Sequence, residues 1–182
     1  MLWAMIQLCG VGVMVLTRLA YRPLLQQGSR QLVGRWILRW PVLIGMVVLP
    51  LLAAGMGGQR WLPLTLSPLA GPLGCLMLAY ACWLFWRSQH DVLLGKDGRE
   101  PWRGGVYQRI RHPLYAALWL AALAQVLLLQ DVLVGGGGVL ALLFSYGRSV
   151  RREESQMLQW LGEAYRQYMQ HTGRLWPRGL AR

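Results

Sequence analysis

Uncharged stretches of the chain alternate with basic segments. Five runs contain no Asp, Glu, Lys or Arg, and they cover residues 1–17, 40–58, 61–86, 114–130 and 132–147. A hydrocarbon core about 30 Å thick needs roughly 20 helical residues. The second and third runs therefore predict helices that cross a bilayer comfortably, and the first run predicts a helix at the lower limit of length.

The last two runs are separated by Gln130 and Asp131 alone. Each run is short for a full crossing, so together they predict the arms of one tight helical hairpin whose polar tip, at Asp131, is solvated. Four glycines at 135–138 lie in an apolar run with no Lys-Ser or Lys-Thr after them. This context favours close helix packing over a phosphate-binding loop.

Local signals set the limits of two other helices. Pro63, Pro68 and Pro72 near the start of the third run predict a helix that begins near Leu69 and leaves the membrane near Trp86. The first run has no basic residues before it, which distinguishes it from a secretory signal. It is therefore predicted to be a retained helix.

The pattern changes after the fifth run. Apolar and aromatic side chains then recur at steps of three and four residues, namely at Met157, Leu158, Leu161, Tyr165 and Tyr168. This spacing predicts an amphipathic helix over residues 150–168. Two interpretations stay open: a surface helix lying on anionic headgroups, or a lid whose inner face closes over residues 104–115.

These elements predict an all-α, multi-pass integral membrane protein. It has about five transmembrane helices, including the C-terminal helical hairpin, and a cytoplasmic amphipathic C-terminal helix. No internal repeat is present, and no polar segment exceeds about 35 of the 182 residues. Residues 1–182 are therefore predicted to form a single membrane domain, without a separate soluble nucleotide-binding domain.

Composition and charge agree with this fold class. Only 14% of the residues are charged and 55% are hydrophobic, whereas a soluble domain carries about 25% charged residues. If every run crosses or returns, 18 of the 19 basic residues lie on one side, and Arg60 alone lies opposite. The positive-inside rule then places those segments in the cytoplasm and the N-terminus outside. The net charge of +12 thus predicts contact with membrane lipids and no nucleic-acid partner.

The three cysteines predict no metal site. Cys9, Cys75 and Cys82 all fall inside apolar runs and show no metal-ligand spacing. They are expected to be buried in lipid or to pack against other helices.

Polar and aromatic residues crowd together at 104–115, directly before the fourth run. The residues with chemical potential are Tyr107, Arg111, His112 and Tyr115. Pro113 excludes His112 from helical geometry and suits a first helical turn, so the fourth helix is expected to begin near Leu114. Its N-terminus, with Arg111, predicts a seat for a ligand carboxylate or phosphate. Alternatively, the arginines are topology anchors and the tyrosines are interfacial belt residues.

Glu153 and Glu154 are the only adjacent carboxylates in the chain. In one interpretation they pair with Arg151, Arg152 or another basic residue, with little energetic consequence if the pairs are exposed. A carboxylate that faces a pocket would instead accept hydrogen bonds from a ribose or attract a cationic ligand group. Both interpretations remain open.

Two ordered groups of residues together resemble a known enzyme family. The first group is Gly105-Val-Tyr107 with Arg111-His-Pro-Leu-Tyr115, and the second is Arg151-Arg-Glu-Glu154 followed by Leu158, Gly162, Tyr165, Tyr168 and Pro177. This arrangement resembles the isoprenylcysteine carboxyl methyltransferase family and its prokaryotic relatives. The likeness covers residues 87–177, about half of the chain, which would form the catalytic core.

The resemblance implies an S-adenosylmethionine-dependent methyltransferase of the prokaryotic inner membrane, with its site on the cytoplasmic side. It implies a lipophilic small-molecule or lipid-modified acceptor with a carboxylate or thiol group. The cofactor-binding residues implied are Trp102, Tyr107, Arg111, His112, Pro113, Leu114, Tyr115, Glu153 and Glu154. Arg148 and Glu153 are the implied catalytic residues. The methyl acceptor and the oligomeric state are left open.

Two positions depart from the family pattern. The family often has Gly shortly after the tyrosine, where this chain has Ala116 and Ala117. The eukaryotic enzymes place an arginine four residues before the key glutamate, where this chain has Ser149, with Arg148 one residue away. These departures favour one alternative, a non-catalytic membrane protein. A second alternative stays open because membrane sterol or steroid reductases, which use NADPH, carry a related Arg-His-Pro-x-Tyr element.

Overall fold

The protein was analysed as a computed structural model, which describes residues 2–25, 40–57, 60–94 and 104–178. These residues form helices and turns, and no β-strand occurs among them. The elements in order are α1 (Leu2–Tyr21), α2 (Trp40–Leu43), the π-helical turn η2 (Ile44–Val48), α3 (Leu49–Gly55), α4 (Ala70–Leu94), the 3₁₀ turn η3 (Gly105–Gln108), α5 (Pro113–Leu129), α6 (Val132–Leu161) and α7 (Glu163–His171). The all-α prediction is confirmed for the described part of the chain.

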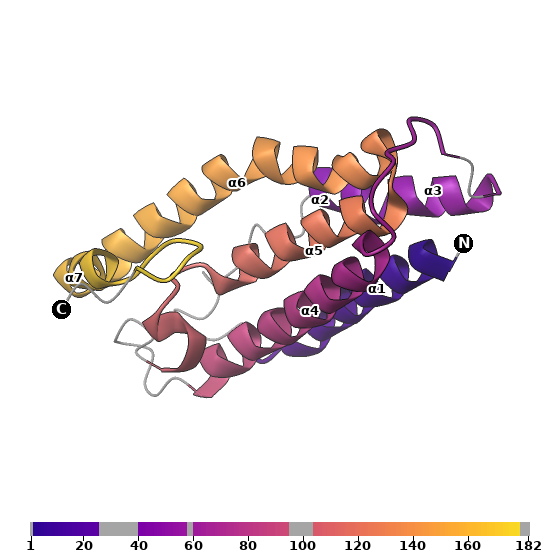
Figure 1. Cartoon of the computed structure of the whole chain (residues 1–182). Helices are drawn as coiled ribbons and strands as arrows, with labels where there is room; N and C mark the ends of the chain where they lie inside the picture. Colours follow the sequence, from indigo (N-terminus) through magenta and orange to yellow (C-terminus); the bar gives the residue numbers. More distant parts are fainter. Residues whose placement is uncertain (1, 26–39, 58–59, 95–103, 179–182) are drawn as a thin grey trace.

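The long helices lie lengthwise in one bundle (Figure 1). α4 packs most extensively against α5, and α5 packs in turn against α6, while α1 lies along α4. The C-terminal ends of α1, α4 and α6 and the start of α5 lie at the end of the bundle that α7 occupies (Figure 1). We call this the basic end. The N-terminus and α3 lie toward the opposite end.

Within the described ranges, two helices are long and apolar enough to cross a membrane, namely α1 and α6. The sequence pointed instead to the second and third runs as the comfortable crossings. The second run forms a shorter helix, Trp40–Gly55. α4 has 25 residues, but Gly, Pro, Tyr and Trp side chains reduce the hydropathy of its apolar part. The expectation of about five spans and their topology remains a prediction.

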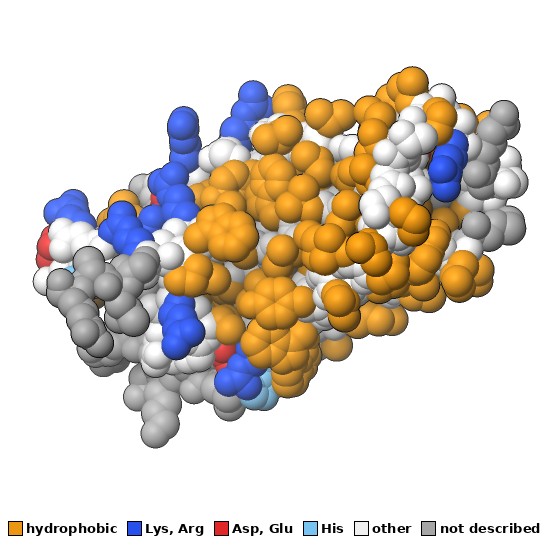
Figure 2. Space-filling model, viewed as in Figure 1, with side chains coloured by type: hydrophobic (Ala, Val, Ile, Leu, Met, Phe, Trp, Pro, Cys, Tyr) orange, Lys and Arg blue, Asp and Glu red, His pale blue; other side chains and the backbone are white. Residues whose placement is uncertain are grey.

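Large apolar side chains cover much of the surface away from the basic end (Figure 2). Leu16 on α1, Leu76 on α4 and Phe144 on α6 are 66%, 70% and 64% exposed. Figure 2 shows most of the Lys and Arg side chains of this face at the end where α7 lies. A broad apolar belt beside a basic end is typical of a surface that faces lipid rather than water.

The predicted hairpin is present, but its tip differs from the expectation. α5 ends at Gln130, which has left-handed backbone angles (φ 49°, ψ 43°), and Asp131 caps α6. Asp131 is not solvated, since it is only 2% exposed. Its Oδ1 accepts from the backbone N–H groups of Leu133 and Val134, and its Oδ2 accepts from Leu62 N at 2.9 Å. The loop before α4 therefore folds over the tip and buries it.

The predicted amphipathic helix over 150–168 is divided between two elements. α6 runs without interruption from Val132 to Leu161, so the second arm of the hairpin continues far beyond its apolar part, residues 132–147. Gly162 then ends it with a positive φ of 54°, and α7 follows at an angle. The charged residues after Gly147 are good helix formers, which explains why the helix does not stop where the apolar run stops.

Close packing in the middle of the bundle agrees with the expectation for the glycine tract. The carbonyl of Gly137 lies where a Cβ atom on Gly45 would stand, so α6 and η2 approach at backbone distance. Gln125 on α5 donates to the carbonyls of Gly45 at 2.9 Å and Val134 at 2.7 Å. Pro50, which has no N–H, follows the π-helical turn. The missing N–H of Pro50 and the bond from Gln125 to the carbonyl of Gly45 both alter the backbone hydrogen bonds here, and together they account for the turn.

Candidate functional site

The turn η3 places Tyr107 in the interior of the basic end. Gly105 has φ +60°, and a Cβ atom there would collide with the carboxylate of Asp91 on α4. That carboxylate accepts from Val106 N at 2.8 Å and pairs with Arg87 at 3.0 Å. Glycine is needed at 105 for both conformation and space. The result is a fixed turn in which Tyr107 is only 2% exposed.

α5 begins where the sequence predicted, with Pro113 at its first position and His112 outside helical geometry (φ −123°, ψ 62°). The C-terminal segment lies beside this start. Arg111 N donates to Gly173 O at 2.8 Å, and His112 N donates to Arg174 O at 3.0 Å. The backbone before α5 is thus held by residues more than 60 positions away, a contact that no local pattern indicates.

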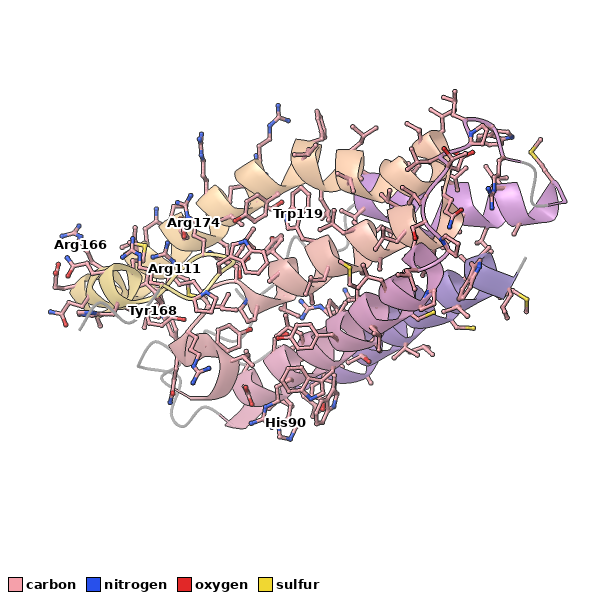
Figure 3. All side chains as sticks on the ribbon, in the orientation of Figure 1. His90, Arg111, Trp119, Arg166, Tyr168 and Arg174 are labelled. Carbon is pink, nitrogen blue, oxygen red and sulfur yellow. The ribbon has the colours of Figure 1, made fainter. Side chains whose placement is uncertain are left out.

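Glu154 gathers three basic side chains around one carboxylate. Its Oε1 lies 3.2 Å from His112 Nε2 and accepts from Arg174 Nε at 3.2 Å, and its Oε2 accepts from Arg174 Nη2 at 2.7 Å. Arg111 Nε lies 3.5 Å from the same Oε1. We call Arg111, His112, Glu154 and Arg174 the C-terminal clasp. Figure 3 shows its labelled members Arg111 and Arg174 at the basic end, near Tyr168.

Glu154 is ionised in this setting. Burial by itself raises the pKa of the carboxyl group, but hydrogen bonds from His112 and Arg174 outweigh burial and lower the pKa to about 2. The sequence predicted a seat for a ligand anion beside Arg111 and His112. The protein places its own carboxylate there.

Glu153 enters a different environment, inside the bundle. It is 4% exposed, and it lies within electrostatic range of Tyr107 and of Arg18 from the last turn of α1. Arg18 Nη1 donates to Gln89 Oε1 on α4 at 3.2 Å, and Gln89 is fully buried. We call Arg18, Gln89, Tyr107 and Glu153 the interior cluster. Four elements, α1, α4, η3 and α6, each contribute one member.

α7 packs against the segment that holds Tyr107 and Arg111, and the lid interpretation remains a prediction. The hydroxyl of Tyr168 donates to the carbonyl of Tyr107 at 2.7 Å, and Arg111 Nη1 donates to Met169 O at 2.6 Å. Burial raises the pKa of Tyr165 and of Tyr168, so both phenols keep their protons at neutral pH. α7 therefore bonds to a member of the C-terminal clasp, Arg111, and to a member of the interior cluster, Tyr107.

Aromatic side chains continue from the clasp into the bundle along α5 and α6. The ring of His112 meets Tyr115 edge-on at 5.8 Å, Tyr115 meets Tyr146 at 5.6 Å, and Trp119 meets Tyr146 at 6.2 Å. Trp119 Nε1 is buried and has no hydrogen-bond partner among the described residues. We call Tyr115, Trp119 and Tyr146 the aromatic wall; its rings pack edge to face, and a π-face that such packing leaves open attracts a positively charged group.

The remaining predicted site residues are distributed unevenly. Pro113 and Leu114 are buried in the first turn of α5. Arg148 is exposed, lies over the Phe144 ring at 5.2 Å and lines a groove of about 300 Å³ with Trp40 and Pro41, so no contact between its guanidinium and the interior cluster is seen. Trp102 lies outside the described residues. Its predicted role and that of Arg148 remain predictions.

Sequence reasoning missed three members of the two polar clusters. Arg174 joins Glu154 across 20 residues, and Arg18 joins Gln89 across 71 residues. A signal was present only for Arg18, a lone cation that ends an apolar run. In the sequence, Arg18 counted only toward the charge asymmetry that predicts the topology.

The described part of the chain shows no group of three or more His, Cys, Asp or Glu side chains that would hold a metal ion. Cys75 and Cys82 are partly buried and Cys9 is exposed, all with free thiols. No protein-family model matches the sequence, and no curated protein matches it either.

Proposed function

We propose that this chain is an integral membrane methyltransferase that uses S-adenosylmethionine and acts on a lipophilic or lipid-borne carboxylate or thiol. Residues 87–177 would form its catalytic core. One observation supports the proposal most: the two halves of the resemblance meet, with His112 Nε2 3.2 Å from Glu154 Oε1 across 42 residues of sequence. Motif halves that lay at opposite ends of the bundle would have no common chemistry.

The side chains at the basic end fit the chemical groups of this cofactor. A buried carboxylate, Glu153, suits ribose hydroxyls or an ammonium group. The aromatic wall of Tyr115, Trp119 and Tyr146 suits the sulfonium charge, because π-faces attract cations most strongly where water is excluded. Trp119 Nε1 offers a buried donor that the described residues do not use.

The two clusters would have different roles. Glu153 and Tyr107 would face the cofactor, with Pro113, Leu114 and Tyr115 lining its site and Trp102 joining by resemblance. Glu154 has Arg111, His112 and Arg174 as its partners, so it would act as a positioning residue. It engages Nε2 of His112, which leaves Nδ1 of that ring for a further partner.

When bound, S-adenosylmethionine supplies a sulfonium methyl group, which the acceptor anion takes by in-line attack while the sulfur–carbon bond breaks. The chain's contribution is to orient and enclose. α7 and the aromatic wall would exclude water, and this removes solvation from opposite charges that neutralise each other in the transition state. A carboxylate or thiolate acceptor needs no general base, so no Ser–His or His–carboxylate base system is required.

The proposal places the basic end in the cytoplasm, at the boundary of an inner membrane of the prokaryotic type. The apolar belt would then lie in the hydrocarbon region, and the acceptor would reach the site from the bilayer. Arg148 would be available at this boundary to attract the anionic acceptor, with Phe144 beneath its guanidinium.

Calorimetric titration of the detergent-purified protein tests the proposal. We expect S-adenosylhomocysteine to bind in the micromolar range and NADPH not to bind. Binding of NADPH alone would favour the reductase alternative, and binding of neither ligand by folded protein would favour a non-catalytic role. A mass-spectrometric comparison of membrane lipids with and without the active protein would then identify the acceptor by the gain of one methyl group.

A further inference from the structure

Arg18 lies outside the segment that resembles the methyltransferase family, yet it reaches the interior cluster. It belongs to the last turn of α1, and its guanidinium is partly buried against α4 through the bond from Nη1 to Gln89 Oε1 at 3.2 Å. A topology anchor needs only to lie near the headgroups. An arginine that turns inward to a fully buried glutamine requires another explanation.

The interior cluster holds opposite charges within electrostatic range of one another. Arg18 interacts electrostatically with Glu153 and with Tyr107, which are 4% and 2% exposed. Placing a cation and a carboxylate in the interior costs desolvation energy, and an apolar pair would often serve stability as well. The arrangement therefore suggests recognition of a ligand that itself carries both charges.

An α-amino acid is such a ligand. Its carboxylate matches the planar fork of a guanidinium, which carries five N–H donors and can hold Gln89 and a carboxylate together. Its ammonium group matches a buried carboxylate such as Glu153. The nearby hydroxyl of Tyr107 adds a further polar group at the same place.

We infer that Arg18 and Glu153 together bind the amino-acid end of S-adenosylmethionine, Arg18 holding its carboxylate and Glu153 its ammonium group. The inference rests on the proposed function and extends it, because it makes α1 part of the cofactor site. The adenosine end would then lie toward the start of α5. The aromatic wall would receive the sulfonium between the two ends.

Two ligands separate this inference from the proposed function. S-adenosylhomocysteine and methylthioadenosine share the nucleoside and a thioether, but only the first carries an amino acid. The amino acid adds hydrogen bonds to charged groups, so the wild-type protein should bind S-adenosylhomocysteine about 10- to 100-fold more tightly than methylthioadenosine. In Arg18→Met the ratio of the two dissociation constants should fall about 3- to 10-fold, because Glu153 still holds the ammonium group, while the affinity for methylthioadenosine stays unchanged.

Arg22→Met is the matched control, since Arg22 lies one turn further on the same segment and is exposed. It should keep the wild-type ratio, and Arg18→Lys should give an intermediate one. If Arg18→Met does not fold in detergent, Glu153→Gln, nearly identical in shape, takes its place and should lower the ratio likewise. An unchanged ratio in folded Arg18→Met or Glu153→Gln would overturn the inference and leave the proposed function intact. Absence of binding of either ligand to wild-type protein would overturn both.

Discussion

Glu153 and Glu154 are neighbours in sequence but belong to different regions of the molecule. Adjacent positions of an α-helix point about 100° apart, so α6 directs Glu154 outward to the clasp and Glu153 inward to the interior cluster. Glu154 meets two arginines and a histidine that join it to the tail. Glu153 lies near Arg18 and Tyr107, between the helices.

Under the proposed function, Glu154 has a structural role and Glu153 has a role in ligand recognition. The clasp balances its charges within the protein and connects α6, the start of α5 and the residues after α7. The interior cluster combines single polar groups from four elements around a buried carboxylate. We therefore expect changes in the clasp to alter stability first, and changes in the interior cluster to alter ligand binding first.

The largest effect is expected on breaking the clasp. Glu154→Ala leaves Arg111 and Arg174 without their shared carboxylate, and it should lower the free energy of unfolding by about 3 kcal/mol. Unfolding in detergent measures this change. Glu163→Ala is the matched control. The side chains of Glu163 and Arg166 are 63% and 65% exposed, so their ion pair should contribute less than about 0.5 kcal/mol. Equal losses in the two variants would contradict the role of the clasp.

The next effect concerns the interior cluster. Glu153→Gln keeps the shape of the side chain but removes its charge, and it should weaken binding of S-adenosylhomocysteine about 3- to 10-fold. The free energy of unfolding should fall less than in Glu154→Ala, because the amide fits the same space and Arg18 keeps its bond to Gln89. Calorimetry and unfolding of the same preparation measure both quantities. A large loss of stability with normal binding would exchange the roles of the two glutamates.

A third prediction concerns the turn η3, whose backbone conformation depends on Gly105. Gly105→Ala puts a Cβ atom at a positive φ and against the Asp91 carboxylate, which should cost about 2 kcal/mol. It should weaken ligand binding as well, since the turn carries Tyr107. Gly104→Ala serves as the control: its φ is −106°, and a Cβ atom there has open space. Equal behaviour of the two variants would show that the turn does not position the site.

A change at the opposite end should leave both clusters intact. Asp131→Ala removes the cap of α6 and the bond from Leu62 N, and it should cost about 1 kcal/mol in stability. Binding of S-adenosylhomocysteine should stay at the wild-type value. A marked loss of binding would show that the two ends of the bundle are coupled.

The smallest effect is the response of the clasp to pH. The pKa of Glu154 is lowered to about 2 from the model-compound value of 4.5, so its contribution is fully present above the unfolded-state value and is lost as the pH falls toward 2. The stability difference between wild type and Glu154→Gln should therefore be constant from pH 8 to pH 5 and shrink below pH 4.5. Unfolding measured across this range tests it. A difference that disappears already near pH 6 would contradict the assigned charge state.

Local signals made part of the fold predictable. Pro113 fixed the start of α5, and the Gln130-Asp131 pair located the turn of the hairpin. The burial of Asp131 was unpredictable, because it depends on a bond from Leu62, 69 residues earlier. The length of α6 was also missed, since charged residues after Gly147 suggested a boundary although they favour helix.

Some residues of the candidate site were likewise predictable from the sequence, and others were not. The Tyr107 to Tyr115 segment and the two glutamates stand out in the sequence because polar residues are rare beside apolar runs. Arg174 and Arg18 do not stand out, since each acquires its role only through a distant partner, Glu154 and Gln89 respectively. Which of the two glutamates faces inward also depends on the rotation of α6, which the packing of the whole bundle determines.

The most direct test of the central claim is to locate the bound cofactor. Ultraviolet irradiation of the purified protein with radiolabelled S-adenosylmethionine, followed by peptide mapping, would identify the residues that contact it. We predict label on peptides that contain Tyr107 to Trp119 or Tyr146 to Met157, and competition by S-adenosylhomocysteine. Label confined to the opposite end of the bundle, or no label that S-adenosylhomocysteine displaces, would contradict the account.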